Sequence, residues 1–253
     1  KLKGIAEVSE WVDLYYPTLK HTARENIEFV GLNALEFFEV FFDNDAPYTL
    51  KEFQLKRGDK DIQYGQWEKL DNVHQPSLHC KAKSCPDLPS LVRDRVLTFK
   101  VKNISYFGPP FVPATKVQRV LVASKHLFIL ESKNTVSDVP FCDRFFVLER
   151  WVVTAEKRED GLYHLNLSIY SQAFFTKKCG FEAQITSKSE ASFKDVALQW
   201  HNMAKEGLKL TEKSRSMRIK RKQNADGIDD ESMSHVDPSE HEDDDGQAQD
   251  YSE

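Results

Sequence analysis

The sequence predicts an α+β fold in which a curved antiparallel sheet of about six or seven strands is closed by one long C-terminal helix. Three observations support this prediction. Two short helical patterns come first, a series of strand patterns follows without intervening helices, and a helical pattern with one apolar stripe comes last. Because a one-sided sheet and a striped helix each have an apolar face to cover, we expect the helix to lie across the sheet.

Two capping-box patterns mark the first helices. Asn33-Ala-Leu-Glu36 opens the strongly apolar LEFFEVFFD, and Thr49-Leu-Lys-Glu52 opens LKEFQLKR, which ends at Gly58. The first helix is apolar on nearly all sides, so we expect it to be deeply buried. The residues before it are expected to form a short strand or coil.

The middle of the chain shows strand patterns, separated by polar or proline-rich stretches. Residues 71–92 read as a polar excursion, and residues 103–113 (NISYFGPPFVP) interrupt the series. A hairpin is expected around Ser124 and Lys125. The predicted strands are residues 61–67, 95–101, 117–123, 126–132, 144–155 and 162–175.

Two of these strands indicate where the core lies. In the last strand one face is dry and the other carries His164, Asn166 and Ser168, as expected for a sheet with one covered side. Residues 145–153 are mostly apolar on both faces, so this strand should be central. Its charged neighbours Glu149 and Arg150 point to opposite faces, which argues against an acid–base pair.

The closing helix is predicted from a regular apolar stripe that follows a Ser192-x-x-Asp195 capping pattern. Laid across a twisted sheet, such a helix gives a helix-grip fold, and the curvature leaves space between the two layers. If side chains do not fill that space, it is a ligand cavity. The stripe consists of Phe193, Val196, Ala197, Trp200, Ala204, Gly207 and Leu208.

Charge divides the C-terminal part of the chain into two segments. Residues 212–222 hold six basic residues and one acid, and residues 223–253 hold twelve acids without Lys or Arg. The preceding residues are close to neutral, at +2. We expect the acidic tail to be disordered. The basic segment could bind anionic lipid, act as a nuclear import signal, or form a solvated helix end.

Several classes of chemistry lack a sequence signal. The chain shows no nucleophile elbow, P-loop, dinucleotide fingerprint or HExxH motif. His74, His79, Cys80 and Cys85 cluster, but without a second ligand pair they are expected to decorate a loop, so neither a metal nor a cofactor is predicted. The four cysteines favour a reducing compartment. No apolar run is long enough to span a bilayer.

Four stretches of the chain resemble the VASt domain, a START-like (StARkin) lipid-transfer domain of sterol transporters that often carry a GRAM domain. These are LEFFEVFFDND, GDKDIQYGQW, VLTFKVKNISYFGPP followed by VQRV, and DVPFCDRFFVLERWVV. Their order and spacing agree with the family over about residues 27–210. The sequence departs from it at Pro110, where the family often has Lys. A transmembrane helix often follows the domain in the family, whereas here the acidic tail follows.

The resemblance implies a non-enzymatic carrier that moves a sterol, or a similar lipid, between membranes in a cavity between the sheet and the closing helix. Gly108–Pro113 and Asp43–Tyr48 are expected near the mouth, where small and polar residues suit a rim. Ser171 and Ala173 leave room by being small. The expected ligand-binding residues are Leu165, Leu167, Ile169, Ala173, Phe193, Ala197 and Trp200.

Two other functions stay open from the sequence. One is a membrane-recruited sensor or scaffold that reads anionic lipids and transfers nothing, and the other is a helix-grip enzyme. A carrier requires a sterol-sized apolar cavity, a sensor a filled one, and an enzyme convergent titratable groups.

The organisation that we expect is an N-terminal extension (1–26), the lipid-binding domain (27–210), the basic segment (211–222) and the tail (223–253). We expect a monomer that acts at the cytoplasmic face of membranes, such as endoplasmic reticulum contact sites. It should contact membrane surfaces and bind no nucleic acid.

Overall fold

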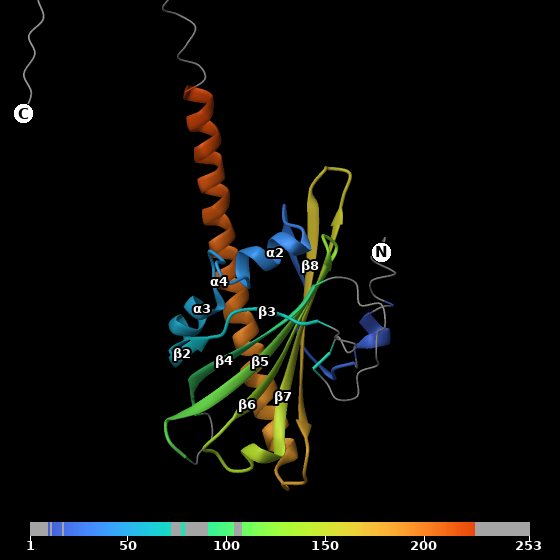
Figure 1. Cartoon of the computed structure of the whole chain (residues 1–253), viewed down its shortest axis with the longest axis vertical. Helices are drawn as coiled ribbons and strands as arrows, with labels where there is room; N and C mark the ends of the chain where they lie inside the picture. Colours follow the sequence, from blue (N-terminus) through green and yellow to red (C-terminus); the bar gives the residue numbers. More distant parts are fainter. Residues whose placement is uncertain are drawn as a thin grey trace, which may run out of the picture. The chain divides into compact units, whose positions relative to one another are not determined.

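The computed structural model describes residues 10, 12–16, 18–71, 77–78, 91–103 and 108–225. The chain divides into two compact units, residues 1–207 and 208–253. The elements in chain order are β1 (His21–Val30), α2 (Ala34–Phe41), α3 (Leu50–Arg57), β2 (Lys60–Tyr64), β3 (Glu68–Lys69), β4 (Leu91–Lys102), β5 (Phe111–Ser124), β6 (Leu127–Val136), a 3₁₀ turn (Cys142–Arg144), β7 (Phe145–Lys157), β8 (Tyr163–Phe175) and α4 (Glu182–Ala225) (Figure 1).

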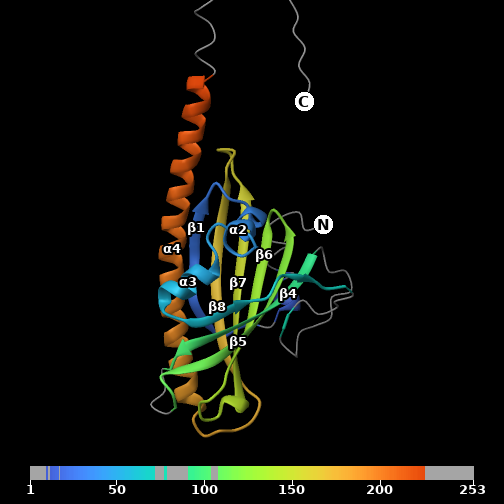
Figure 2. The ribbon, with the colours of Figure 1, turned by 60° about the vertical axis from the view of Figure 1, so that its left-hand side comes forward.

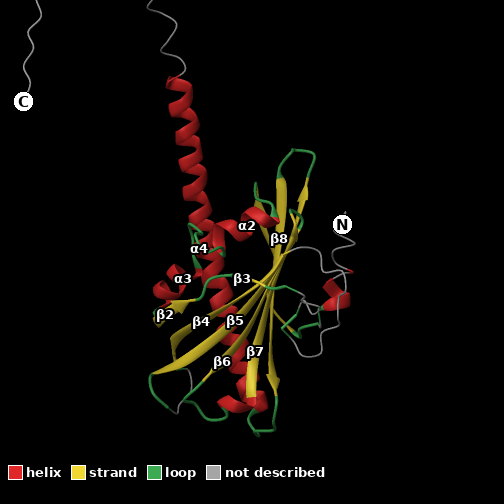
Figure 3. Ribbon diagram, viewed as in Figure 1, coloured by secondary structure: helices red, strands yellow, loops and turns green. Residues whose placement is uncertain are grey.

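The described strands form one eight-stranded antiparallel sheet in the order β1-β8-β7-β6-β5-β4-β2, with β3 also pairing with β4. The predicted curved antiparallel sheet is confirmed, and β7 is central as expected. The strand count is higher than predicted because β1 is a full strand of ten residues and β3 is a short extra one. Figure 2 shows the sheet curving past the lower half of α4, and Figure 3 shows helices and strands segregated as in an α+β fold.

Both predicted capping boxes begin helices. The Asn33 side chain accepts hydrogen bonds from the backbone N–H groups of Leu35 and Glu36, while the Glu36 carboxylate accepts from Asn33 N at 2.9 Å. Thr49 caps α3 by accepting from Glu52 N at 3.2 Å. Gly58 ends α3 with φ of +91°, a left-handed conformation that glycine adopts without steric cost.

The predicted start of the closing helix is wrong by ten residues. Helix α4 begins at Glu182, and Ser192 lies inside it. The Glu182 carboxylate accepts a hydrogen bond from Cys179 N at 2.8 Å. This bond, followed by those from the backbone N–H groups of Glu182 and Gly180, holds the pKa of the Glu182 carboxyl below its ordinary value. The first turns lack the regular apolar stripe, since most residues from 182 to 192 are polar and none is buried, so periodicity alone missed them.

Three other expectations change at their boundaries. Strand β5 begins at Phe111, so the last three residues of the expected break at 103–113 are in the sheet. Strand β4 begins at Leu91, inside the stretch read as a polar excursion. Helix α4 continues to Ala225, past the expected start of the tail, and residues 226–253 lie outside the described part.

The core lies between α4 and the concave face of the sheet and is strongly aromatic. The predicted stripe residues Phe193, Ala197, Trp200 and Ala204 are all at most 5% exposed. Trp200 packs edge-on against Trp151 of β7, with ring centroids 4.5 Å apart. Rings from α2, β6, β7 and α4 complete this aromatic cluster, which consists of Phe37, Phe38, Phe41, Phe42, Phe128, Trp151 and Trp200.

The opposite, convex face of the sheet is also covered. Tyr16, N-terminal to the expected domain start, is 3% exposed and packs with Leu121, Leu127 and other apolar side chains of this face. Arg150 lies there too, and pairs with Glu131 at 2.7 Å. The folded body therefore reaches N-terminal of residue 27, and the charges of β7 are paired on both faces of the sheet.

Candidate functional site

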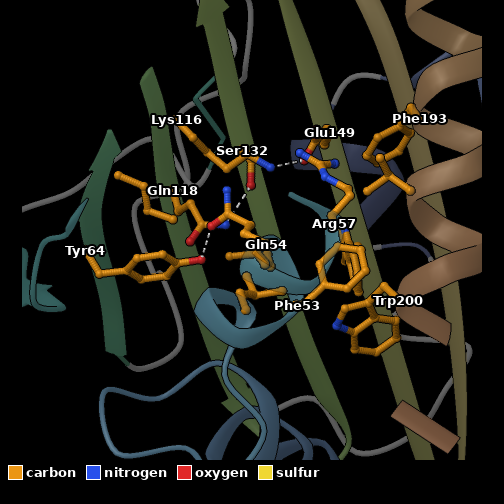
Figure 4. Close-up of a pocket in the computed structure, with 15 residues that line it drawn as sticks. Phe53, Gln54, Arg57, Tyr64, Lys116, Gln118, Ser132, Glu149, Phe193 and Trp200 are labelled. Atoms are coloured by element: carbon orange, nitrogen blue, oxygen red, sulfur yellow. Dashed lines mark hydrogen bonds and ion pairs between the residues drawn. The ribbon is translucent and has the colours of Figure 1, made fainter. Parts of the chain in front are cut away.

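A pocket lies between α3, α4 and the concave face of the sheet (Figure 4). Its free volume is about 40 Å³. The floor comes from strands β4 to β7 and the roof from the two helices. The lining residues are Leu50, Phe53, Gln54, Arg57, Tyr64, Leu97, Lys116, Gln118, Leu130, Ser132, Glu149, Trp151, Phe193, Val196 and Trp200.

A polar row crosses the floor of the pocket. Gln118 of β5 pairs in register with Ser132 of β6, and Ser132 pairs with Glu149 of β7, so the three side chains share the concave face. Lys116 lies two residues before Gln118 and therefore on the same face. We call Lys116, Gln118, Ser132 and Glu149 the polar row.

The members of the polar row are paired with one another. Lys116 Nζ lies 2.9 Å from Glu149 Oε2, and Gln118 Nε2 donates to Ser132 Oγ at 3.1 Å. Arg95 Nε donates to Gln118 Oε1 at 2.9 Å, while the Arg95 guanidinium stacks over the ring of Trp67. Burial lowers the pKa of Arg95 to about 10, so it is still charged at neutral pH. The row is thus a preformed polar surface.

A second polar group lies under α3. The Tyr64 hydroxyl donates to Gln54 Oε1 at 2.5 Å, Gln54 Nε2 donates to Asp59 at 3.3 Å, and Arg57 reaches the same carboxylate at 2.6 Å. Burial raises the pKa of the Tyr64 phenol above its ordinary value, so Tyr64 stays protonated at neutral pH. The titratable side chains that line the pocket are therefore engaged with each other, with Gln54 or with Asp59.

The α4 side of the pocket is apolar. Phe193, Val196 and Trp200 face the sheet at successive turns of the helix, opposite Trp151 of β7. Trp200 is fully buried, and its Nε1 has no hydrogen-bond partner among the residues that the structure describes. The pocket thus has an apolar wall, a polar floor and one buried donor without an acceptor.

The structure brings two of the seven expected ligand-binding residues into this pocket, Phe193 and Trp200. Ala197 is buried on the same helix, and Leu165, Leu167 and Ile169 are buried on the concave side of β8, but none of these lines the pocket. Ala173 is half-buried and also lies outside the lining.

Sequence reasoning missed the polar row. Lys116 and Gln118 share a strand face with the buried Ala114 and Val120 in β5, and Glu149 shares one with Trp151. A polar residue on a predicted core face is a signal for a site, but its partners come together only through the register of three strands.

The expected rim segments, Gly108–Pro113 and Asp43–Tyr48, contribute no lining residue to this pocket. The expected loop cluster of His74, His79, Cys80 and Cys85 lies outside the described residues. Within the described part of the chain, no group of three His, Cys, Asp or Glu side chains could hold a metal ion. No helix of that part is long and apolar enough to cross a membrane.

A curved antiparallel sheet gripping a long C-terminal helix over an internal pocket is the architecture of StAR-related lipid-transfer domains, and the sequence comparison agrees. The family model described as "VAD1 Analog of StAR-related lipid transfer domain" (VASt) matches residues 28–192. The chain belongs to the VASt family. The matched range runs from β1 into α4 and includes the whole polar floor of the pocket, while the lining residues Phe193, Val196 and Trp200 follow it in α4.

The VASt domain also has a curated relative. The chain is 24% identical over 174 residues to Protein VASCULAR ASSOCIATED DEATH 1, chloroplastic, of Arabidopsis thaliana. The match covers 69% of this chain and 26% of the relative, so the chain spans about a quarter of that protein's length.

Proposed function

We propose that this VASt domain binds a sterol and carries it between membranes without changing it chemically. The observation that carries the proposal is a pocket enclosed by α4 and the concave sheet, with an apolar wall on one side and the polar row on the other. A sterol has the same two-sided chemistry, a rigid apolar body and one polar end. Its apolar body would bury against Phe193 and Val196 of α4, which favours binding at about 25 cal/mol per Å² removed from water.

The small volume of the pocket bears on whether the domain is open or closed to a ligand. Pockets that hold drug-sized ligands have volumes of roughly 300–1,000 Å³, whereas the volume here is about 40 Å³. We propose that the described state is closed and that uptake moves α4 and α3 away from the sheet. The expected wall residues Leu165, Leu167, Ile169, Ala173 and Ala197 would then border the enlarged cavity.

The small pocket also favours a second candidate, a VASt domain that senses or scaffolds at membranes and transfers nothing. Acid–base catalysis is less well supported, since Lys116 and Glu149 are paired with each other at 2.9 Å. Under either candidate, we propose a monomer that acts at the cytoplasmic face of membranes, at endoplasmic reticulum contact sites. We also keep residues 27–210 as the proposed binding domain.

Sterol transfer between vesicles tests the proposal. Val196→Trp places a large ring in the pocket wall, and Leu198→Trp places the same ring on the same helix at a position that is 42% exposed. We expect Val196→Trp to lower the transfer of a fluorescent sterol at least tenfold and Leu198→Trp to leave it unchanged. Circular-dichroism melts confirm that both variants are folded.

Ala173→Trp in the same assay locates the ligand more finely. If the cavity extends toward Ala173 when α4 opens, this variant also loses transfer. Wild-type protein that is folded and transfers no sterol would favour the sensor candidate. Undiminished transfer by folded Val196→Trp would show that the ligand binds elsewhere.

A further inference from the structure

The indole N–H of Trp200 is a buried donor that the fold leaves unpaired. Trp200 is fully buried, and its Nε1 has no hydrogen-bond partner among the described residues. Nearly all buried polar groups in folded proteins are paired. Leaving such a donor unpaired is unfavourable, and an acceptor on a bound ligand would remove that cost.

Other polar groups around the pocket, unlike Trp200 Nε1, have hydrogen-bond or ion-pair partners. Lys116 pairs with Glu149, Gln118 bridges Arg95 and Ser132, and the Tyr64 hydroxyl donates to Gln54. In the described part of the chain, buried side-chain nitrogens without a hydrogen-bond partner occur on Trp200 and His201, whereas the buried Glu190 Oε1 lies 2.7 Å from His21 Nε2. Of these, Trp200 is the one that lines the pocket.

The ring is oriented so that its N–H points toward the pocket lining, and in the described closed state the Nε1 atom itself is fully buried. Figure 4 shows the Trp200 indole with its nitrogen on the side of Phe53, toward the other lining side chains. The rest of the indole is held by aromatic neighbours, with the rings of Trp151 and Phe41 4.5 Å and 5.4 Å away between centroids. A rigidly held donor that faces a pocket is the arrangement that gives polar specificity in an otherwise apolar site.

We propose that Trp200 Nε1–H donates to an oxygen at the polar end of the bound lipid and thereby selects lipids that carry an alcohol or a ketone. This proposal rests on the proposed lipid-binding function and specifies the chemistry that the site reads. An indole N–H donates and does not accept. The site therefore requires an acceptor in the ligand, and a ketone satisfies Trp200 as well as an alcohol does.

Three probes of nearly the same shape test this requirement: cholesterol (an alcohol), cholest-4-en-3-one (a ketone) and cholestane (without oxygen). Their affinities are compared in the wild type and in Trp200→Phe, which keeps an aromatic ring and removes the donor. We expect the wild type to prefer both oxygenated sterols. We expect Trp200→Phe to reduce that preference by about threefold to tenfold, the value of one hydrogen bond.

Trp67→Phe is the matched control. Trp67 is also buried, but its Nε1 donates to Phe42 O at 2.7 Å and Trp67 lies outside the pocket lining. This variant should lose stability and keep the preference of the wild type. Benzothienylalanine at position 200, in which sulfur replaces the N–H at nearly constant shape, gives the same test if Trp200→Phe folds poorly.

The outcomes separate the two proposals. If the wild type binds none of the three sterols, the proposed sterol carrier is wrong. If the wild type binds sterols and loss of the N–H weakens all three equally, or none, Trp200 serves only packing and the donor proposal is overturned.

Discussion

At the scale of single residues, the buried pair Glu131–Arg150 matters most for stability. The two side chains are 1% and 5% exposed, and Arg150 donates to Glu131 Oε1 from both Nε and Nη2, at 3.0 Å and 2.7 Å. Glu131→Gln keeps the shape and removes the charge that Arg150 faces. We expect the free energy of unfolding to fall by about 3–5 kcal/mol in urea titrations, as when one partner of a buried pair is removed.

Asp61→Asn is the control for this prediction, because it makes the same kind of change in an exposed pair. Asp61 and Lys100 are 2.7 Å apart, with side chains 64% and 48% exposed. Water screens such a pair, so the urea midpoint should hardly move. Equal effects of the two substitutions would contradict the importance assigned to the buried pair.

His201 should make stability depend on pH. It is buried on α4 with its ring edge against Phe29 of β1, and burial first, then the charges of Lys205 and Arg24, lower its pKa. An unfolded His titrates near 6.5. Below about pH 6.5 the unfolded chain binds a proton at His201 that the folded chain does not readily bind. The contribution of neutral His201 to the free energy of unfolding is therefore fully present above about pH 6.5 and is lost as the pH falls below it.

His201→Phe tests this sign. The variant cannot bind the proton, so its stability relative to the wild type should rise as pH falls from about 7.5 to 5.5. The comparison uses free energies of unfolding at each pH, which removes any constant packing difference between His and Phe. Parallel pH curves for the two proteins would count against the buried neutral histidine.

At the scale of elements, α4 is held close to the turn after α2. A Cβ added at Gly207 would lie 2.9–3.1 Å from ring atoms of Tyr48, nearer than side chains normally approach. Alanine favours a helix over glycine by about 1 kcal/mol, but the contact with the ring should outweigh this gain. We expect Gly207→Ala to lower the melting temperature of the wild type. In a protein that already carries Tyr48→Ala, we expect the same substitution to raise the melting temperature. The same sign in both backgrounds would refute the close contact.

Features that follow from the local sequence pattern, such as the period of a helix, could be predicted. Features that depend on how distant strands pair could not. The stripe of Phe193, Ala197 and Trp200 follows the 3.6-residue period and is buried as predicted. The first turns of α4 are polar and carry no such period. The pocket was predicted only as a space between helix and sheet, since Lys116 and Glu149 lie 33 residues apart and meet only through strand register.

For the whole molecule, the proposed function requires the VASt domain to open from the described closed state to admit a lipid. The aromatic cluster fills much of the space between α4 and the sheet, which explains why the remaining pocket is small. Opening must therefore separate the packed faces of α4 and the sheet.

A sterol-binding measurement is the simplest test of whether the domain opens and takes up a lipid in this pocket. The naturally fluorescent dehydroergosterol absorbs where tryptophan emits, and Trp151 and Trp200 line the pocket. We predict saturable energy transfer from tryptophan to this sterol at one molecule per chain, and its loss in folded Val196→Trp. A folded wild-type protein that shows no saturable transfer at any accessible sterol concentration would contradict the account.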